Sequence, residues 1–119
     1  MKPLVALSIR QPYAWLIINA GKDIENRTWR TRHRGRVLIH ASLRYAGEYQ
    51  NWPWEIEPPP YASFRRGGIV GEAEIIDVID RRNGSPWFEG PYGFVLANVR
   101  PRRFRACRGM PGLFVPDYD

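Results

Sequence analysis

The sequence has one cysteine, two lysines and no long apolar run. Because Cys107 is the only cysteine, an internal disulfide is excluded and a reducing compartment is suitable, so we expect a cytoplasmic protein. No apolar stretch approaches the roughly 20 residues of a membrane-spanning helix, so no membrane partner is expected. Arg10 interrupts the short apolar stretch at the N-terminus, which therefore does not resemble a secretory signal peptide.

Metal ligands and phosphate-binding loops are also scarce. The two histidines and Cys107 lack metal-site spacing, and the segment RRGGIVG lacks the Lys-Ser/Thr pair of a phosphate-binding loop. We therefore expect no metal and no other cofactor. His40 lies within the apolar segment LIHAS, which is typical of a hydrogen-bonded core histidine. Ser8 and Ser42 lie near the ends of expected strands, where a hydroxyl would bond a ligand or cap the chain.

Arginine is abundant: it supplies 16 of the 18 basic residues, and the formal net charge is +6. Guanidinium groups bind phosphates in a forked geometry and stack on bases, so this bias favours a nucleic-acid partner, although a coding bias toward arginine is an alternative. In WRTRHRGR, basic residues recur at every second position, and in an extended chain they would face one side. The expected phosphate-contacting residues are Arg30, Arg32, Arg34 and Arg36.

A second basic cluster spans residues 100–108, whereas acidic residues gather in residues 48–57 and 72–80. Such segregation of charge along the chain predicts a surface that faces a charged partner.

Periodicity predicts the order of the secondary structure. Strands are expected over residues 4–9, 22–29, 36–42, 67–80, 92–99 and 112–116, and a largely buried helix over residues 10–21. Pro12 suits the first helical turn, and Gly21 suits the position just past the helix end. Residues 43–66 contain three consecutive prolines and are expected to form a loop with at most one helical piece.

These elements predict a β-rich α+β fold, a small mixed β-barrel of five or six strands with one or two flanking helices. At 119 residues the chain is long enough for one hydrophobic core and too short for two. We therefore predict a single domain over residues 1–119.

A charged segment follows the expected helix directly. In KDIENR, Lys22 and Glu25 would face opposite sides of a regular strand, so they meet only if Lys22 lies in the turn after the helix or a bulge intervenes. Glu25 and Arg27 share a face in either case. The alternatives are a cleft lined by these three side chains and an ion pair at the rim, contributing at most about 1 kcal/mol.

Five segments occur in the order typical of one family: LSIRQPYAWLI, GKDIENRTW, RGRVLIHAS, GGIVGEAEIIDVI and SPWFEGPYGFVL. Together they resemble the ASCH domain, a branch of the PUA-like superfamily. The resemblance implies a PUA-like barrel with a cleft lined by the Lys-x-x-Glu-x-Arg segment, and an association with RNA or with catalysis on RNA.

One branch of that family hydrolyses N4-acetylcytidine with a lysine, a threonine and a glutamate, and other members are described as ribonucleases. By resemblance, Lys22 matches the catalytic lysine, whereas the threonine position falls at Glu25. The stand-ins for the glutamate are Glu72, Glu74 and Glu89.

The sequence thus predicts an RNA- or modified-nucleoside-binding domain. A hydrolase on the same cleft, with Lys22 and Glu25 as catalytic residues, and a non-catalytic protein adaptor remain alternatives. Trp15, Trp29, Trp87 and Phe88 are candidates for base stacking, each more typical of a core, and Trp87 is preferred because SPWF is expected to be a loop. The expected substrate-binding residues are Arg10, Gln11, Arg27, Ser42 and Trp87, with the amides of the helix start near Gln11 able to hold an anion.

Overall fold

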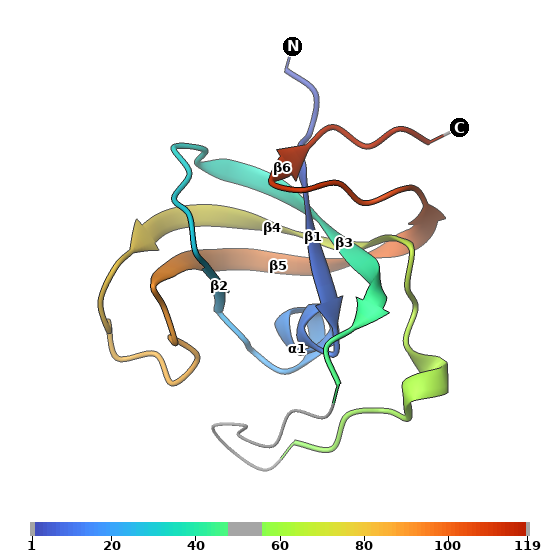
Figure 1. Ribbon diagram of the computed structural model, residues 1–119, viewed down its shortest axis with the longest axis horizontal. Coiled ribbons are helices and arrows are strands. Elements are labelled where there is room, and N and C mark those ends of the chain that lie inside the picture. The colour runs from blue at the N-terminus through green and yellow to red at the C-terminus, as the bar shows by residue number, and fades with distance from the viewer. Residues whose placement is uncertain (1, 48–55, 119) are drawn as a thin grey trace.

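Six strands and one α-helix form the regular structure of residues 2–47 and 56–118, the part of the chain that this computed structural model describes (Figure 1). In chain order the elements are β1 (Ala6–Gln11), α1 (Tyr13–Asn19), β2 (Ile24–Arg27), β3 (Gly35–Tyr45), the short 3-10 helix η1 (Tyr61–Ser63), β4 (Gly68–Ile79), β5 (Tyr92–Ala106) and β6 (Leu113–Phe114). The expected β-rich α+β fold is confirmed.

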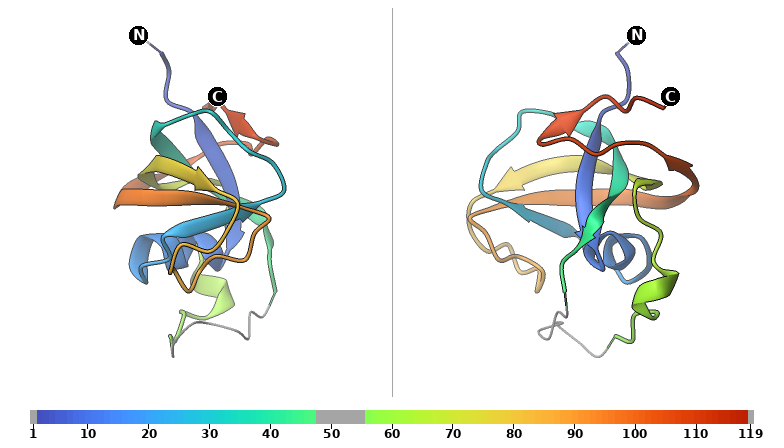
Figure 2. Two further views of the ribbon diagram at one scale, coloured as in Figure 1. Left: turned by 90° about the vertical axis from the view of Figure 1, so that its left-hand side faces the viewer. Right: turned by 45° about the vertical axis from the view of Figure 1, so that its right-hand side comes forward.

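The strands form one sheet in the order β2-β5-β4-β3-β1-β6. β1 and β3 are parallel and every other neighbouring pair is antiparallel, so the sheet is mixed, as the sequence predicts. The sheet curls strongly, and α1 lies at one end of the curl, where it contacts β1, β3 and β5 (Figure 2). The result is a half-barrel, consistent with the expected PUA-like barrel.

The core fills the concave side of this sheet. Leu7, Ile39, Ile75 and Phe94 come from four different strands and are at most 1% exposed. Burial of apolar area of this kind is the main stabilising term of such a fold.

The alternation along β4 holds only in part. Ile69, Ala73 and Ile75 are buried as predicted, but the register against β5 shifts between Ile75 and Asp77. An extra residue in one strand reverses the side on which the following side chains lie. Val78 is therefore buried and Asp77 is exposed, although Asp77 comes two residues after the buried Ile75.

The helix is shorter than predicted. It begins at Tyr13 rather than within the first residues of RQPY, and Gly21, just past its end, has a φ of 74° that suits glycine. No helix in residues 2–47 and 56–118 has the length and apolar character needed to cross a bilayer.

Two strands are longer than predicted, because β3 continues to Tyr45 and β5 to Ala106. Within the expected loop over residues 43–66, η1 is the one helical piece among the described residues. The rest of that prediction includes residues 48–55, which lie outside the described residues, as does most of the first acidic segment.

Candidate functional site

Three charged side chains form a continuous chain of contacts beside β2. Lys22 Nζ lies 3.0 Å from Glu25 Oε1, and Arg27 Nη2 lies 3.0 Å from Glu25 Oε2. Lys22 is 4% exposed and Glu25 7% exposed, so this is a buried cluster and not an ion pair at the rim. Buried charges are tolerated only when they are paired and hydrogen-bonded, and both oxygens of Glu25 meet a cation.

The turn after α1 places Lys22 within this cluster. Its backbone N–H donates to Leu16 O at 3.1 Å, which keeps Lys22 outside the regular alternation of β2. The Lys22 ammonium also donates to Ile24 O and lies 5.6 Å from the centre of the Tyr13 ring. Burial, followed by the negative charges of Glu89 and Glu25, raises the pKa of Tyr13 above its usual value.

Two cavities meet at Glu25. The larger is an open groove of about 1190 Å³, and the smaller has a volume of about 150 Å³. Glu25, Asn26 and Tyr13 line both cavities, whereas Lys22 lines only the smaller and Arg27 only the larger. The single cleft expected from the sequence is therefore divided, with Glu25 at the boundary.

Cationic and hydroxyl side chains are prominent in the lining of the groove. Its described lining contains four arginines and one carboxylate, that of Glu25. The arginines are Arg10, Arg27, Arg44 and Arg108, and the hydroxyl groups belong to Ser8, Thr28 and Ser42 in addition to Tyr13. The formal charge of the described lining is therefore positive, and Glu25 is paired with Arg27 and Lys22.

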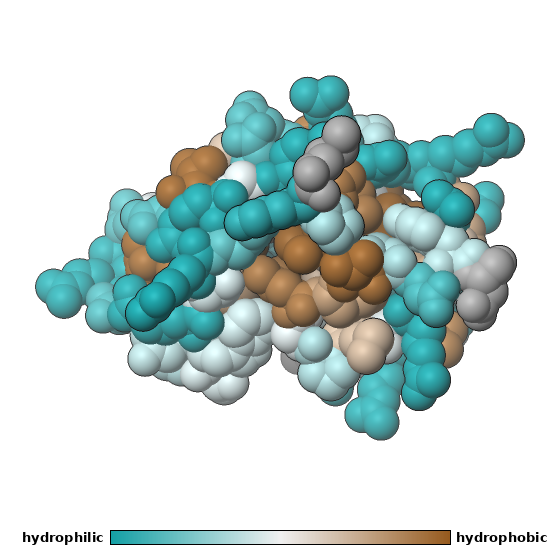
Figure 3. All heavy atoms as spheres, turned by 90° about the horizontal axis from the view of Figure 1, so that it is seen from above, coloured by the Kyte–Doolittle hydropathy of each residue, from teal (hydrophilic) through white to brown (hydrophobic). Residues whose placement is uncertain are grey.

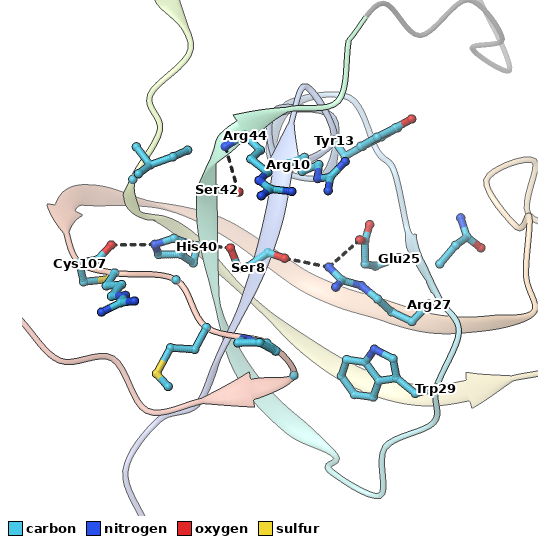
Figure 4. A pocket seen from close by; sticks show the side chains of 18 of the residues that line it. Ser8, Arg10, Tyr13, Glu25, Arg27, Trp29, His40, Ser42, Arg44 and Cys107 are labelled. Atoms are coloured by element: carbon cyan, nitrogen blue, oxygen red, sulfur yellow. Dashed lines mark hydrogen bonds and ion pairs between the residues drawn. The ribbon is translucent and has the colours of Figure 1, made fainter.

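Ser8 lies near the middle of this site, between His40 and Arg27 (Figure 4). Its hydroxyl is 2.9 Å from His40 Nδ1, and its carbonyl oxygen accepts from Arg27 Nη2 at 2.9 Å. His40 Nε2 donates to Cys107 O at 2.8 Å, so His40, 1% exposed, is the hydrogen-bonded core residue that the sequence predicts. Burial raises the pKa of the Cys107 thiol.

Gln11 has a structural role that differs from the expected contact with substrate. It is 3% exposed, its Oε1 accepts from Trp15 N at 2.9 Å, and its Nε2 donates to Arg65 O at 3.0 Å. Gln11 therefore occupies a helix-start amide itself and is not among the described residues lining either cavity. One of the helix-start amides expected to hold an anion, that of Trp15, is accordingly taken by the Gln11 side chain.

Trp87 and Phe88 are also placed differently from the prediction. They are 4% and 8% exposed and pack with Leu16 and Ile24, so the loop that contains them is tucked into the core. Trp87 lines the smaller cavity and is not among the described residues that line the groove. Trp29 is the tryptophan that lines the groove. Its ring packs edge-on against that of Phe94, with 5.2 Å between the ring centres.

The four alternating arginines are all exposed, as predicted, but only Arg36 lies within a strand. Arg30 lies 3.8 Å from Asp80, Arg34 lies 4.0 Å from Asp77, and Arg36 lies 3.1 Å from Glu72. These acids belong to β4 or directly follow it, so the charges that are segregated along the sequence are adjacent in space.

Arg32 differs from its three neighbours, because it has no ion pair within the described part of the chain. Together with Arg30, Thr31 and Arg34 it lines a depression of about 650 Å³ outside the groove.

In the space-filling view from the side of β6, hydrophilic side chains project around a central apolar area (Figure 3).

Sequence reasoning missed Arg44 and the segment 107–112, which closes one side of the groove. Arg44 lies two residues after Ser42 on β3, so the period of a strand would have placed both on one face. Arg108 had been assigned to the second basic cluster without any link to Lys22 or Glu25. The described residues contain no group of three or more histidine, cysteine or acidic side chains placed to hold a metal ion.

Comparison with known proteins is consistent with this fold. The human protein activating signal cointegrator 1 is 26% identical over 115 residues, which cover 77% of this chain and 18% of that protein. The chain thus spans about a fifth of the length of this relative. The profile of the ASCH domain matches residues 7–101, about four fifths of the sequence. The chain therefore belongs to the ASCH domain family.

Proposed function

We propose that this ASCH domain binds RNA, or a modified nucleoside, in the large groove. The observation that carries the proposal is the charge of the groove: Arg27 and Lys22 pair with its one described carboxylate, Glu25, and three further arginines remain. A polyanion gains from such a surface through phosphate contacts and release of counterions.

The lining also offers separate groups for phosphate and for base. Arg10, Arg44 and Arg108 would contact phosphates, because guanidinium groups bind phosphate oxygens in pairs. Arg27, next to the paired Glu25, would donate to the edge of a base. Its position is fixed by β2, which makes it suitable for recognition that depends on geometry.

Trp29 supplies an aromatic surface in the same groove. Unpaired bases stack on aromatic side chains, and each such contact contributes about 1–3 kcal/mol to binding of single strands. Single-stranded RNA therefore fits this groove better than a duplex, whose base faces are covered. The exposed Arg32 would extend the phosphate contacts beyond the groove.

The test compares a double variant, Arg44→Ala with Arg108→Ala, with wild type in fluorescence anisotropy on a labelled single-stranded RNA. Each lost phosphate contact should reduce the slope of log K against log salt by about 0.7, so we expect a reduction of about 1.4. Arg82→Ala with Arg103→Ala removes the same number of charges from exposed positions outside the groove and serves as the control. An unchanged slope in the double variant would contradict the proposal.

A second candidate function is amide hydrolysis in the smaller cavity. It is favoured by the 3.0 Å contact of Lys22 with Glu25 and by Glu89, which, unlike Glu72 and Glu74, is among the described residues lining that cavity. A carboxylate would take a proton from water, which attacks the amide carbonyl, while the Lys22 ammonium stabilises the oxyanion.

This candidate is tested by incubating N4-acetylcytidine with wild type, Lys22→Ala and Glu89→Gln, with circular dichroism to verify folding. Release of cytidine that depends on both residues supports hydrolysis, and turnover that survives both substitutions contradicts it. An exposed apolar GSPWF loop would favour the adaptor alternative, but Trp87 and Phe88 in that loop are buried.

A further inference from the structure

Ser8 and His40 have the geometry of a nucleophile and its general base. The two residues are direct partners in the parallel pairing of β1 with β3, and Ser8 Oγ lies 2.9 Å from His40 Nδ1. A hydrogen bond from a serine hydroxyl to a histidine ring nitrogen activates the nucleophile of serine hydrolases, where that nitrogen is Nε2; here it is Nδ1. RNA binding in the groove makes no use of it.

The other ring nitrogen fixes the tautomer of His40. A carbonyl oxygen only accepts, so the 2.8 Å contact with Cys107 O requires the proton on His40 Nε2. In the neutral ring Nδ1 is then the acceptor, and the Ser8 hydroxyl must donate to it. His40 is 1% exposed, and its ring packs edge-on against that of Phe114, with 5.7 Å between the ring centres. This packing holds the orientation of the imidazole.

Gly109 packs closely against the pair of Ser8 and His40. A Cβ atom at this position would lie 2.9 Å from Ser8 Oγ and 2.8 Å from His40 Cε1, closer than such atoms can approach. A larger residue at position 109 would therefore displace the Ser8 hydroxyl or the His40 ring, both of which line the groove. Arg27 Nη2 donates to the backbone carbonyl oxygen of Ser8, and the Arg27 side chain lines the same groove.

We propose that Ser8 is a nucleophile, activated by His40, that hydrolyses a carboxylic ester carried by a phosphate-bearing molecule. The phosphate is specified by the arginines of the groove, and the ester by the serine and its base. This activity goes beyond the proposed binding of RNA, because binding requires neither the hydroxyl nor the imidazole.

The hydrolysis requires no reactant other than the ester, water and groups on the protein. Ser8 Oγ forms a bond to the carbonyl carbon, and its proton moves to His40 Nδ1. The carbon–oxygen bond to the alcohol then breaks, and the alcohol leaves with the proton from Nδ1. Water, deprotonated by the same nitrogen, attacks the acyl-serine and releases the acid, which regenerates Ser8. Throughout, Cys107 O accepts from Nε2 and stabilises the imidazolium.

A fluorophosphonate probe tests the nucleophile without RNA, since Ser8 Oγ would attack phosphorus and displace fluoride. We expect one adduct by intact mass, mapped to Ser8, and none in Ser8→Ala. Gly109→Ala should slow labelling at least about 10²-fold, because its methyl group would displace the Ser8 hydroxyl or the His40 ring. Ser63→Ala, an exposed hydroxyl outside the groove, should label like wild type.

Turnover is then measured with 2′(3′)-O-acetyladenosine 5′-phosphate and with the same ester lacking the phosphate. We expect at least about tenfold faster hydrolysis of the phosphate-bearing ester, and loss of activity in Ser8→Ala. Wild-type protein that neither labels nor hydrolyses the ester would overturn the assignment, as would an adduct that persists in Ser8→Ala. Equal rates for the two esters would overturn the substrate class. RNA binding is measured separately, so either proposal can fail alone.

Discussion

Lys22 and Glu25 form an ion pair, with 3.0 Å between Nζ and Oε1, although they are three positions apart in the sequence. In a regular strand that spacing places two side chains on opposite sides. The pair forms because Lys22 precedes β2 and lies in the turn that follows α1. The turn directs the ammonium toward Ile24 O and the Glu25 carboxylate. Glu25 consequently has Lys22 on the side of the small cavity and Arg27 on the side of the groove.

Removal of the negative charge of Glu25 should strongly destabilise the fold. Glu25→Gln would leave the Lys22 ammonium buried beside Arg27 without a compensating anion, and we expect a loss of about 3 kcal/mol in the free energy of unfolding. Lys22→Met should cost less, about 1 kcal/mol, because Arg27 still neutralises Glu25. Urea unfolding followed by circular dichroism measures both changes.

The matched control for that comparison is Glu57→Gln, which alters an exposed carboxylate and should stay within about 0.5 kcal/mol of wild type. If Glu25→Gln were as stable as this control, the pairing of Glu25 with Lys22 and Arg27 would not contribute to stability as described.

Glu72 should give the protein a component of acid sensitivity. The hydrogen bond from Arg36, with the charges of Arg36, Arg102 and Arg100, lowers the pKa of Glu72 below its usual value of 4.5. Between the two pKa values the unfolded chain binds more protons than the folded one, so stability rises with pH there. The contribution is present above pH 4.5 and is lost as the pH falls through the folded value.

The measurement is the urea concentration at the midpoint of unfolding, for wild type and Glu72→Gln, as the pH is lowered from above 4.5 through the lowered pKa of Glu72. The variant should show a smaller fall in midpoint on acidification, because residue 72 no longer takes up a proton. Parallel curves for the two proteins, displaced by a constant amount, would rule out this source of acid sensitivity.

Arg32 and Arg36 should contribute unequally to RNA binding although both are exposed. Arg36 forms an ion pair with Glu72, with 3.1 Å between Nη2 and Oε2, whereas Arg32 has no ion pair in the described part of the chain. We expect Arg32→Ala to reduce the salt slope of RNA binding by about 0.7, and Arg36→Ala to reduce it by clearly less. Anisotropy titrations at several salt concentrations measure both slopes, and equal reductions would show that pairing with Glu72 does not limit Arg36.

Local pattern predicted most of the fold. The alternation through Ile69, Ala73 and Ile75 identifies β4, and Gly21 identifies the end of α1, because strand period and the glycine requirement act over a few neighbouring residues. The same local rules also gave the condition under which Lys22 and Glu25 meet. They failed after Ile75, where a shift in pairing with a distant strand reverses the faces.

The sequence by itself determined the order of the elements, the arginine-rich charge and the charged segment at Lys22, Glu25 and Arg27, since these depend on composition and neighbouring residues. Only the tertiary structure decided that Trp87 is buried, that Arg30, Arg34 and Arg36 lie against the acids of the β4 region, and that residues 107–112 complete the groove beside Ser8. The physical reason is that curling of the sheet brings together segments 30 to 100 residues apart, and the pairing of such distant strands is encoded by no single stretch of sequence.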